Sequence, residues 1–230
     1  MGNQRTFASM AWGAKGKVPR RERFLAEMDA GIPWPRLLRL SEPHYPKAGN
    51  GRQPLGLEKM LRSYFLQQWF NRSDPQAEDA IYDSESMRRF ARVALGDDVA
   101  LDETSILRLR QPLEKHQLTG AIFEAIGGLL EAKGRLPRSG TIVDATIIAA
   151  PSSTSRRPLS ERWRMINRIR SRTRACGEHP CRVLKQLWGF TKVRYRGLAK
   201  NLARAETMFA LANLYQVRRQ LLPAGMRCEL

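Results

Sequence analysis

The stretch Leu57-Glu-Lys-Met-Leu-Arg-Ser-Tyr-Phe-Leu-Gln-Gln-Trp69 carries the clearest helical pattern in this chain of 230 residues. Its apolar and aromatic side chains recur at i, i+3, i+4, i+7 and i+8, namely at Leu57, Met60, Leu61, Tyr64 and Phe65. Side chains at this spacing lie on one face of an α-helix, so the stretch predicts a helix whose apolar stripe is buried.

Further helical patterns flank this stretch on both sides. They cover residues 20–30, 36–40, 76–82, 87–94, 102–112 and 117–133, with Pro112 expected to limit the fifth and Gly134 to stop the last. Ser73-Asp-Pro75 offers a helix cap followed by proline at the first helical position. Residues 1–135 are therefore predicted to form a multi-helix domain, and the fold class is predicted to be mainly α. Short helices joined by tight turns are compatible with helix-turn-helix DNA binding, but other small helical domains share this pattern.

One stretch predicts a β-strand, Gly140-Thr-Ile-Val-Asp-Ala-Thr-Ile-Ile-Ala-Ala150. Aspartate is a poor strand former, so Asp144 at its centre needs a reason. Either the carboxylate hydrogen-bonds a nearby turn, or it is a metal ligand on the first strand of a nuclease-like sheet. The residue alone leaves both interpretations open, and other carboxylates of such a site would favour the second.

The charge of the chain favours a polyanionic partner. The formal net charge is +18, and residues 156–204 hold 15 Lys and Arg against only Glu161 and Glu178. Within this region, residues 187–200 interleave aromatic side chains with cations, which suits contact with a phosphate backbone and exposed bases. The candidate DNA-binding residues of this stretch are Lys192, Arg194, Arg196 and Lys200. Residues 202–222 predict a final amphipathic helix that packs on the core.

The remaining composition predicts a cytoplasmic protein without a membrane partner. Three cysteines do not make a disulfide framework, and free thiols suit a reducing compartment. No stretch approaches the roughly 18 consecutive apolar residues of a transmembrane helix, and the N-terminus lacks an apolar signal core.

Four blocks of the sequence resemble bacterial insertion-sequence transposases of the DDE type. The blocks are Pro46–Pro54, the region through Met87–Ala91, Thr141–Thr154 and Glu178–Asn201. The resemblance implies a DNA-binding helical domain at residues 1–135 and an RNase H-like α/β catalytic domain at residues 136–230. It also implies Mg²⁺ as cofactor, the terminal inverted repeats of an insertion element as DNA partner, and a nucleoid-associated bacterial protein that forms homo-oligomers or hetero-oligomers with intact transposase.

The resemblance also assigns site residues. Asp144 occupies the position of the first catalytic Asp and Glu178 that of the catalytic Glu, and both would be Mg²⁺ ligands. Arg174 and Lys185 match the family's arginine–glutamate–lysine signature, because three residues separate Arg174 from Glu178 and six separate Glu178 from Lys185. The resemblance assigns both to DNA binding. Many members carry a tyrosine before that arginine, and Ser171 stands in its place here.

The second aspartate of the family has no counterpart between Asp144 and Glu178. The 33 residues between them contain no aspartate. The further strands of an RNase H-like sheet cannot fit there, since each needs about five residues plus connections. We therefore expect a truncated remnant of the catalytic domain, one strand plus C-terminal helices, with the join between Thr154 and about Trp163. Two metals need several carboxylates to hold them, so this chain is expected to be inactive in DNA cleavage.

Three functions are compatible with the sequence. The first is a DDE transposase by descent that is catalytically defective and still binds DNA. The alternative is a non-enzymatic DNA-binding protein that inhibits transposition by occupying element ends or by joining intact transposase. A third, an unrelated RNA-binding protein, leaves the blocks around Asp144 and Glu178 unexplained.

Overall fold

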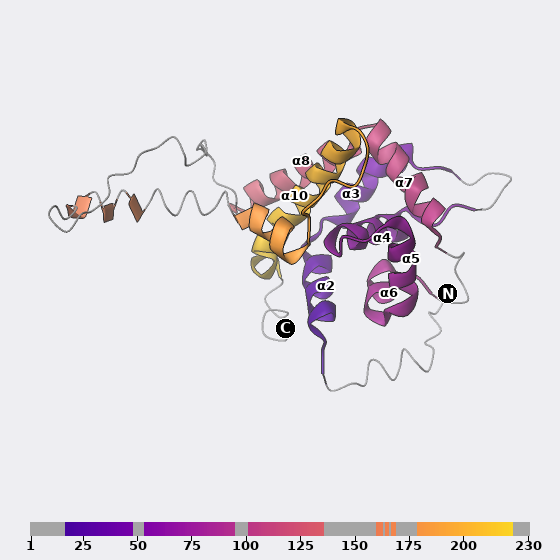
Figure 1. Cartoon of the computed structure of the whole chain (residues 1–230), viewed down its shortest axis with the longest axis horizontal. Helices are drawn as coiled ribbons and strands as arrows, with labels where there is room; N and C mark the ends of the chain where they lie inside the picture. Colours follow the sequence, from indigo (N-terminus) through magenta and orange to yellow (C-terminus); the bar gives the residue numbers. More distant parts are fainter. Residues whose placement is uncertain are drawn as a thin grey trace.

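The computed structural model describes residues 17–47, 53–94, 101–135 and 179–222 and part of 160–168, and the first four ranges form a helical bundle (Figure 1). The longer elements are α2 (Arg20–Gly31), α3 (Trp34–Ser41), α4 (Leu57–Trp69), α5 (Asp74–Asp83), α6 (Glu85–Ala91), α7 (Glu103–Lys115), α8 (Leu118–Ala132) and α10 (Leu198–Leu221). A 3₁₀ turn, η1 (Glu42–His44), and a π-helical turn, η2 (Val183–Leu187), complete them. The prediction of a mainly α fold is confirmed. The predicted strand at residues 140–150 lies outside the described residues.

Helix α4 lies at the centre of the bundle. Its predicted bounds are confirmed, and so is the burial of its stripe at Met60, Leu61, Tyr64 and Phe65, but burial extends beyond the stripe to every residue from Met60 to Trp69. Helices α3, α5, α6, α7 and α10 all contact α4 and cover it from several sides (Figure 1). The helix therefore carries polar side chains into the core, where they need hydrogen-bond partners.

Local signals explain how α5 begins. The Ser73 hydroxyl accepts a hydrogen bond from the Gln76 backbone N–H at 3.4 Å, and the Ser73 N–H donates to Gln76 Oε1 at 3.2 Å, which is a complete capping box. The predicted cap is confirmed, although Pro75 is the second helical residue rather than the first, because α5 begins at Asp74.

Helix α7 corrects one prediction. Pro112 does not limit it, since the helix continues to Lys115. A proline inside a helix removes one backbone hydrogen bond and costs about 3 kcal/mol. Leu113 directly after it is 1% exposed, so burial of this side chain stabilises the continued helix.

Residues with left-handed backbone end several helices. Asn71 (φ 47°) follows α4, Arg92 (φ 57°) follows α6, and Gln117 (φ 52°) separates α7 from α8. Gly134 (φ 65°) closes α8 as predicted, and glycine adopts this conformation without strain. Because Arg92 turns the chain, α6 ends at Ala91, before the predicted break at Gly96.

The C-terminal segment belongs to the same core as the N-terminal helices. Helix α10 packs mainly on α8 and also contacts α2, α4 and α7 (Figure 1). Val183, Leu184 and Trp188 join the same buried cluster. The hydrophobic core thus runs across the predicted domain boundary at residue 135. None of the helices in the described ranges is long and apolar enough to cross a membrane.

Candidate functional site

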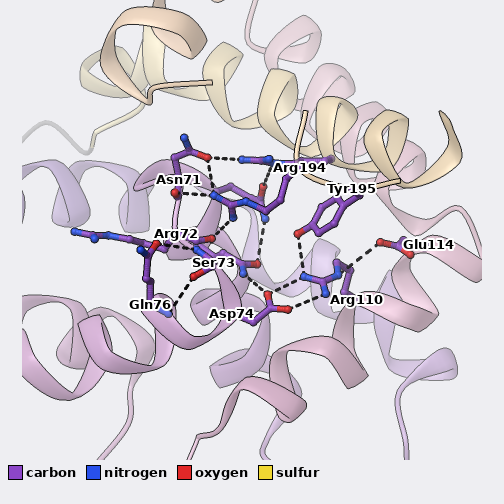
Figure 2. A network of polar contacts seen from close by, with 12 residues as sticks. Asn71, Arg72, Ser73, Asp74, Gln76, Arg110, Glu114, Arg194 and Tyr195 are labelled. Atoms are coloured by element: carbon purple, nitrogen blue, oxygen red, sulfur yellow. Dashed lines mark hydrogen bonds and ion pairs between the residues drawn. The ribbon is translucent and has the colours of Figure 1, made fainter. Parts of the chain in front are cut away.

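A network of polar side chains surrounds the turn between α4 and α5 (Figure 2). Three arginines meet there, and we call them the arginine cluster: Arg110 from α7, Arg194 from the loop before α10, and Arg204 from α10 itself. The cluster joins segments more than 80 residues apart, since Arg110 donates to the hydroxyl of Tyr195.

Arg110 has two carboxylate partners and one hydroxyl partner. Its Nη1 and Nη2 donate to the two carboxylate oxygens of Asp74 at 2.8 and 2.9 Å, its Nη1 also donates to Tyr195 Oη at 2.9 Å, and its Nε lies 3.7 Å from Glu114 Oε1. Burial disfavours the charged forms of both Asp74 and Arg110. The hydrogen bonds outweigh burial, so the pKa of Asp74 lies below its ordinary value and the pKa of Arg110 lies above it.

Arg194 fastens the C-terminal loop to the α4–α5 turn. Its Nη2 donates to the backbone oxygen of Asn71 at 2.8 Å and to Asn71 Oδ1 at 3.0 Å, and its Nη1 donates to the backbone oxygen of Arg72 (Figure 2). Asn71 Nδ2 in turn donates to the Gly189 carbonyl at 2.8 Å. The left-handed backbone at Asn71 therefore presents both its carbonyl and its amide to the loop.

Arg204 is the most deeply buried member of the cluster, at 2% exposure. Its Nη2 donates to Asn71 Oδ1 at 2.6 Å and its Nε to Gln68 Oε1 at 3.3 Å. The guanidinium lies over the ring of Phe190, with 4.9 Å to the centroid. Burial, followed by the charge of the neighbouring Arg194, lowers the pKa of Arg204.

The structure separates the predicted DNA-binding residues into two groups. Lys185, Lys192, Arg196 and Lys200 have exposed side chains. Arg194 is also exposed, but its guanidinium is committed to the α4–α5 turn. The predicted contact of aromatic rings with exposed bases is wrong for Trp188, which is 5% exposed and packs edge-on against Tyr215 at 6.0 Å.

The predicted catalytic residues Asp144 and Glu178, and also Arg174, lie outside the described residues. Within the described ranges, no group of three or more His, Cys, Asp or Glu side chains is placed to hold a metal ion. Cys181 is a free, exposed thiol. The described residues therefore supply no complete set of ligands for Mg²⁺.

Sequence reasoning missed most of the buried ionic residues. Asp74 and Arg110 had no predicted role, and neither did Arg62, which bonds Asp29 at 2.8 Å and Glu58 at 2.9 Å while 1% exposed. One usable signal was present in the last helix. Arg204 precedes the buried residues Thr207, Met208 and Leu211 at helical spacing, so it lies on the apolar face.

Comparison with known proteins gives one family match. Residues 14–112 match the family described as Transposase domain (DUF772). The match spans helices α2 to α6 and most of α7, and it supports a transposase family for this chain. It contains Asn71, Asp74 and Arg110 of the polar network, whereas Arg194 and Arg204 lie beyond it. No solved structure matches the chain.

Proposed function

We propose that this chain, with its transposase-domain match at residues 14–112, binds the DNA ends of an insertion element and does not complete a catalytic site of its own. One observation carries the proposal. Residues 179–205 hold seven Lys and Arg and no Asp or Glu, and this stretch is fastened onto the matched helical region by Arg194.

The acid-free stretch, residues 179–205, suits a phosphate backbone for two reasons. Lys185, Lys192 and Arg196 are exposed, and a polyanion that binds them releases its condensed counterions. The stretch is also ordered by its own hydrogen bonds, since Asn201 Nδ2 donates to the carbonyls of Tyr195 and Gly197 at 2.6 and 2.7 Å. Lys200 is exposed as well, although its charge also acts on Glu114.

The catalytic part of the proposal rests on the sequence. The resemblance to DDE transposases gives Asp144 and Glu178 as catalytic residues and Mg²⁺ ligands, and the second aspartate is missing between them. Bound Mg²⁺ would stabilise the attacking and leaving oxygens of a phosphodiester, which requires several carboxylates around two ions. Two carboxylates do not supply that geometry, so we propose that this copy binds DNA without cutting it.

A binding and cleavage experiment tests both parts. The full chain is titrated into labelled duplexes that carry the terminal inverted repeats flanking its coding locus, and into shuffled duplexes of equal length. We expect tighter binding to the repeats, and no nicking of either duplex with Mg²⁺. Equal affinity for both duplexes would refute specific binding to the element ends, and absence of binding to either duplex would refute DNA binding altogether. Mg²⁺-dependent nicking would show that the catalytic site is complete.

A second candidate function is inhibition of transposition through assembly with an intact transposase. The observation that favours it is a group of exposed apolar side chains in the same C-terminal segment, Leu187, Val193, Leu198 and Leu202, of which Leu198 is 86% exposed. Helical spacing places Leu198 and Leu202 on one face of α10. Light scattering of the chain mixed with an intact relative tests this candidate, and replacing both leucines with serine should abolish a mixed complex. A mixed complex that survives the double replacement would exclude this face.

A further inference from the structure

Buried arginines in the described part of the chain differ in their counter-ions. Arg62 pairs with Asp29 and Glu58, and Arg110 pairs with Asp74 and Glu114. Arg204 is as deeply buried as Arg62, but its hydrogen-bond partners among the described residues are the neutral amide oxygens of Gln68 and Asn71. A buried cation without a carboxylate is an unusual arrangement, because such a charge is costly to remove from water.

The Arg204 guanidinium has unused hydrogen-bonding capacity. Its Nη1 is buried and has no hydrogen-bond partner among the described residues. Its Nε and Nη2 are occupied, and the rings of Phe190 and Tyr195 lie at 4.9 and 5.9 Å. A ring contacts the flat face of a guanidinium, whereas N–H groups point outward from its edge. The Nη1 edge is therefore the part that can receive an acceptor.

A second guanidinium lies beside it. Arg194 Nη2 and Arg204 Nη2 donate to the same oxygen, Asn71 Oδ1, at 3.0 and 2.6 Å. Two positive groups that share one neutral acceptor repel each other, and the pKa of Arg204 is lowered by burial and then by Arg194. An anion with several oxygens would accept from both groups and neutralise the excess charge.

We propose that Arg194 and Arg204 together bind one phosphate group, and that in the proposed function this is a phosphate of the DNA backbone. This site would give the proposed function a specific phosphate contact. It rests on the proposed function only for the assumption that the phosphate belongs to DNA. A phosphate offers three or more acceptor oxygens, which suits two neighbouring planar guanidiniums.

The site is closed in this structure, because Arg204 Nη1 has no contact with solvent. Arg194 is the exposed partner and holds the loop through the carbonyls of Asn71 and Arg72. Binding therefore requires the Arg194 side chain to exchange those carbonyls for phosphate oxygens. The exchange would couple anion binding to a local movement of residues 191–197.

The first experiment uses inorganic phosphate alone as probe. Thermal melting of the full chain is compared in phosphate and in chloride at equal ionic strength, for wild type, Arg204→Met and the control Arg39→Gln, which replaces an exposed arginine of α3 outside residues 179–205. Because a ligand that binds only the folded state raises its stability, phosphate should raise the melting temperature of wild type and the control by about 3 °C or more. Arg204→Met should retain only the general effect of the salt. If Arg204→Met does not fold, Arg194→Gln should show the same lost response.

The second experiment uses duplex DNA with the same variants. Loss of a charge-assisted contact should weaken binding on the order of tenfold in Arg204→Met and lower the salt slope by about one. If Arg204→Met loses both the melting response to phosphate and part of its DNA affinity, the site binds a phosphate of the DNA backbone. A lost phosphate response with unchanged DNA affinity supports a site for free phosphate. An equal phosphate response in all variants, together with unchanged DNA binding, would overturn the site and leave the proposed function standing. Absence of DNA binding in wild type with an intact phosphate response would remove the function and leave the site.

Discussion

The ion pair between Asp74 and Arg110 should make a large contribution to the stability of the bundle. Removing one partner of a buried pair costs about 3–5 kcal/mol, because the remaining charge is left without a counter-ion. The Arg110 side chain is 10% exposed and that of Asp74 24% exposed, so water stabilises part of the separated charges. We therefore expect Asp74→Asn to lower the free energy of unfolding by about 2–3 kcal/mol. The new amide would also turn an N–H toward the guanidinium.

Urea denaturation followed by circular dichroism measures this effect. The pKa of Asp74 lies below its ordinary value, so its contribution to stability is present above about pH 4 and decreases as the pH falls through the lowered value. The difference between wild type and Asp74→Asn should therefore be constant near neutral pH and become smaller in acid. A double-mutant cycle with Arg110→Met isolates the pair. A cost below about 0.5 kcal/mol at pH 7, or a coupling energy near zero, would refute the reasoning.

Three further predictions follow from the same structure. Ser73→Ala should destabilise the chain by about 1 kcal/mol in urea denaturation, because α5 loses its capping box; no change would mean that water replaces the cap. Burial raises the pKa of Tyr64 to about 12, since the loss of solvent outweighs the hydrogen bond with Thr207. The free energy of unfolding should thus fall between pH 10 and 12, and Tyr64→Phe should make it less dependent on pH in this range. An equal pH dependence in both proteins would contradict the raised pKa of Tyr64. Lys192→Gln with Arg196→Gln should weaken DNA binding across sequences and lower the salt slope by about two, and an unchanged slope would exclude this surface.

Helices with strong local signals could be predicted from the sequence. The apolar spacing of residues 57–69, the cap at Ser73 and the stop at Gly134 are all set by neighbouring residues. Predictions failed where tertiary burial decided the outcome. Helix α7 passes through Pro112 because the Leu113 side chain after it is buried, and α4 is buried from Met60 to Trp69 because several other helices cover it.

The polar network could not be predicted because its members are distant in sequence. Arg194 meets Asn71 across 123 residues, and Arg204 meets the same side chain across 133. The sequence pattern of alternating aromatic and cationic residues is the same whether the rings are exposed or buried. The pattern therefore indicated base contacts for Trp188, although its ring is buried. The assignment of Asp144 and Glu178 as catalytic residues stays a prediction from the resemblance.

The salt dependence of DNA binding by the full chain tests the central claim most directly. Exposed Lys185, Lys192 and Arg196, with a smaller part from Lys200, should neutralise three to four phosphates. The logarithm of the association constant should then fall with the logarithm of salt concentration with a slope of about −3 or steeper. A slope near zero, or no measurable binding at low salt, would contradict the account.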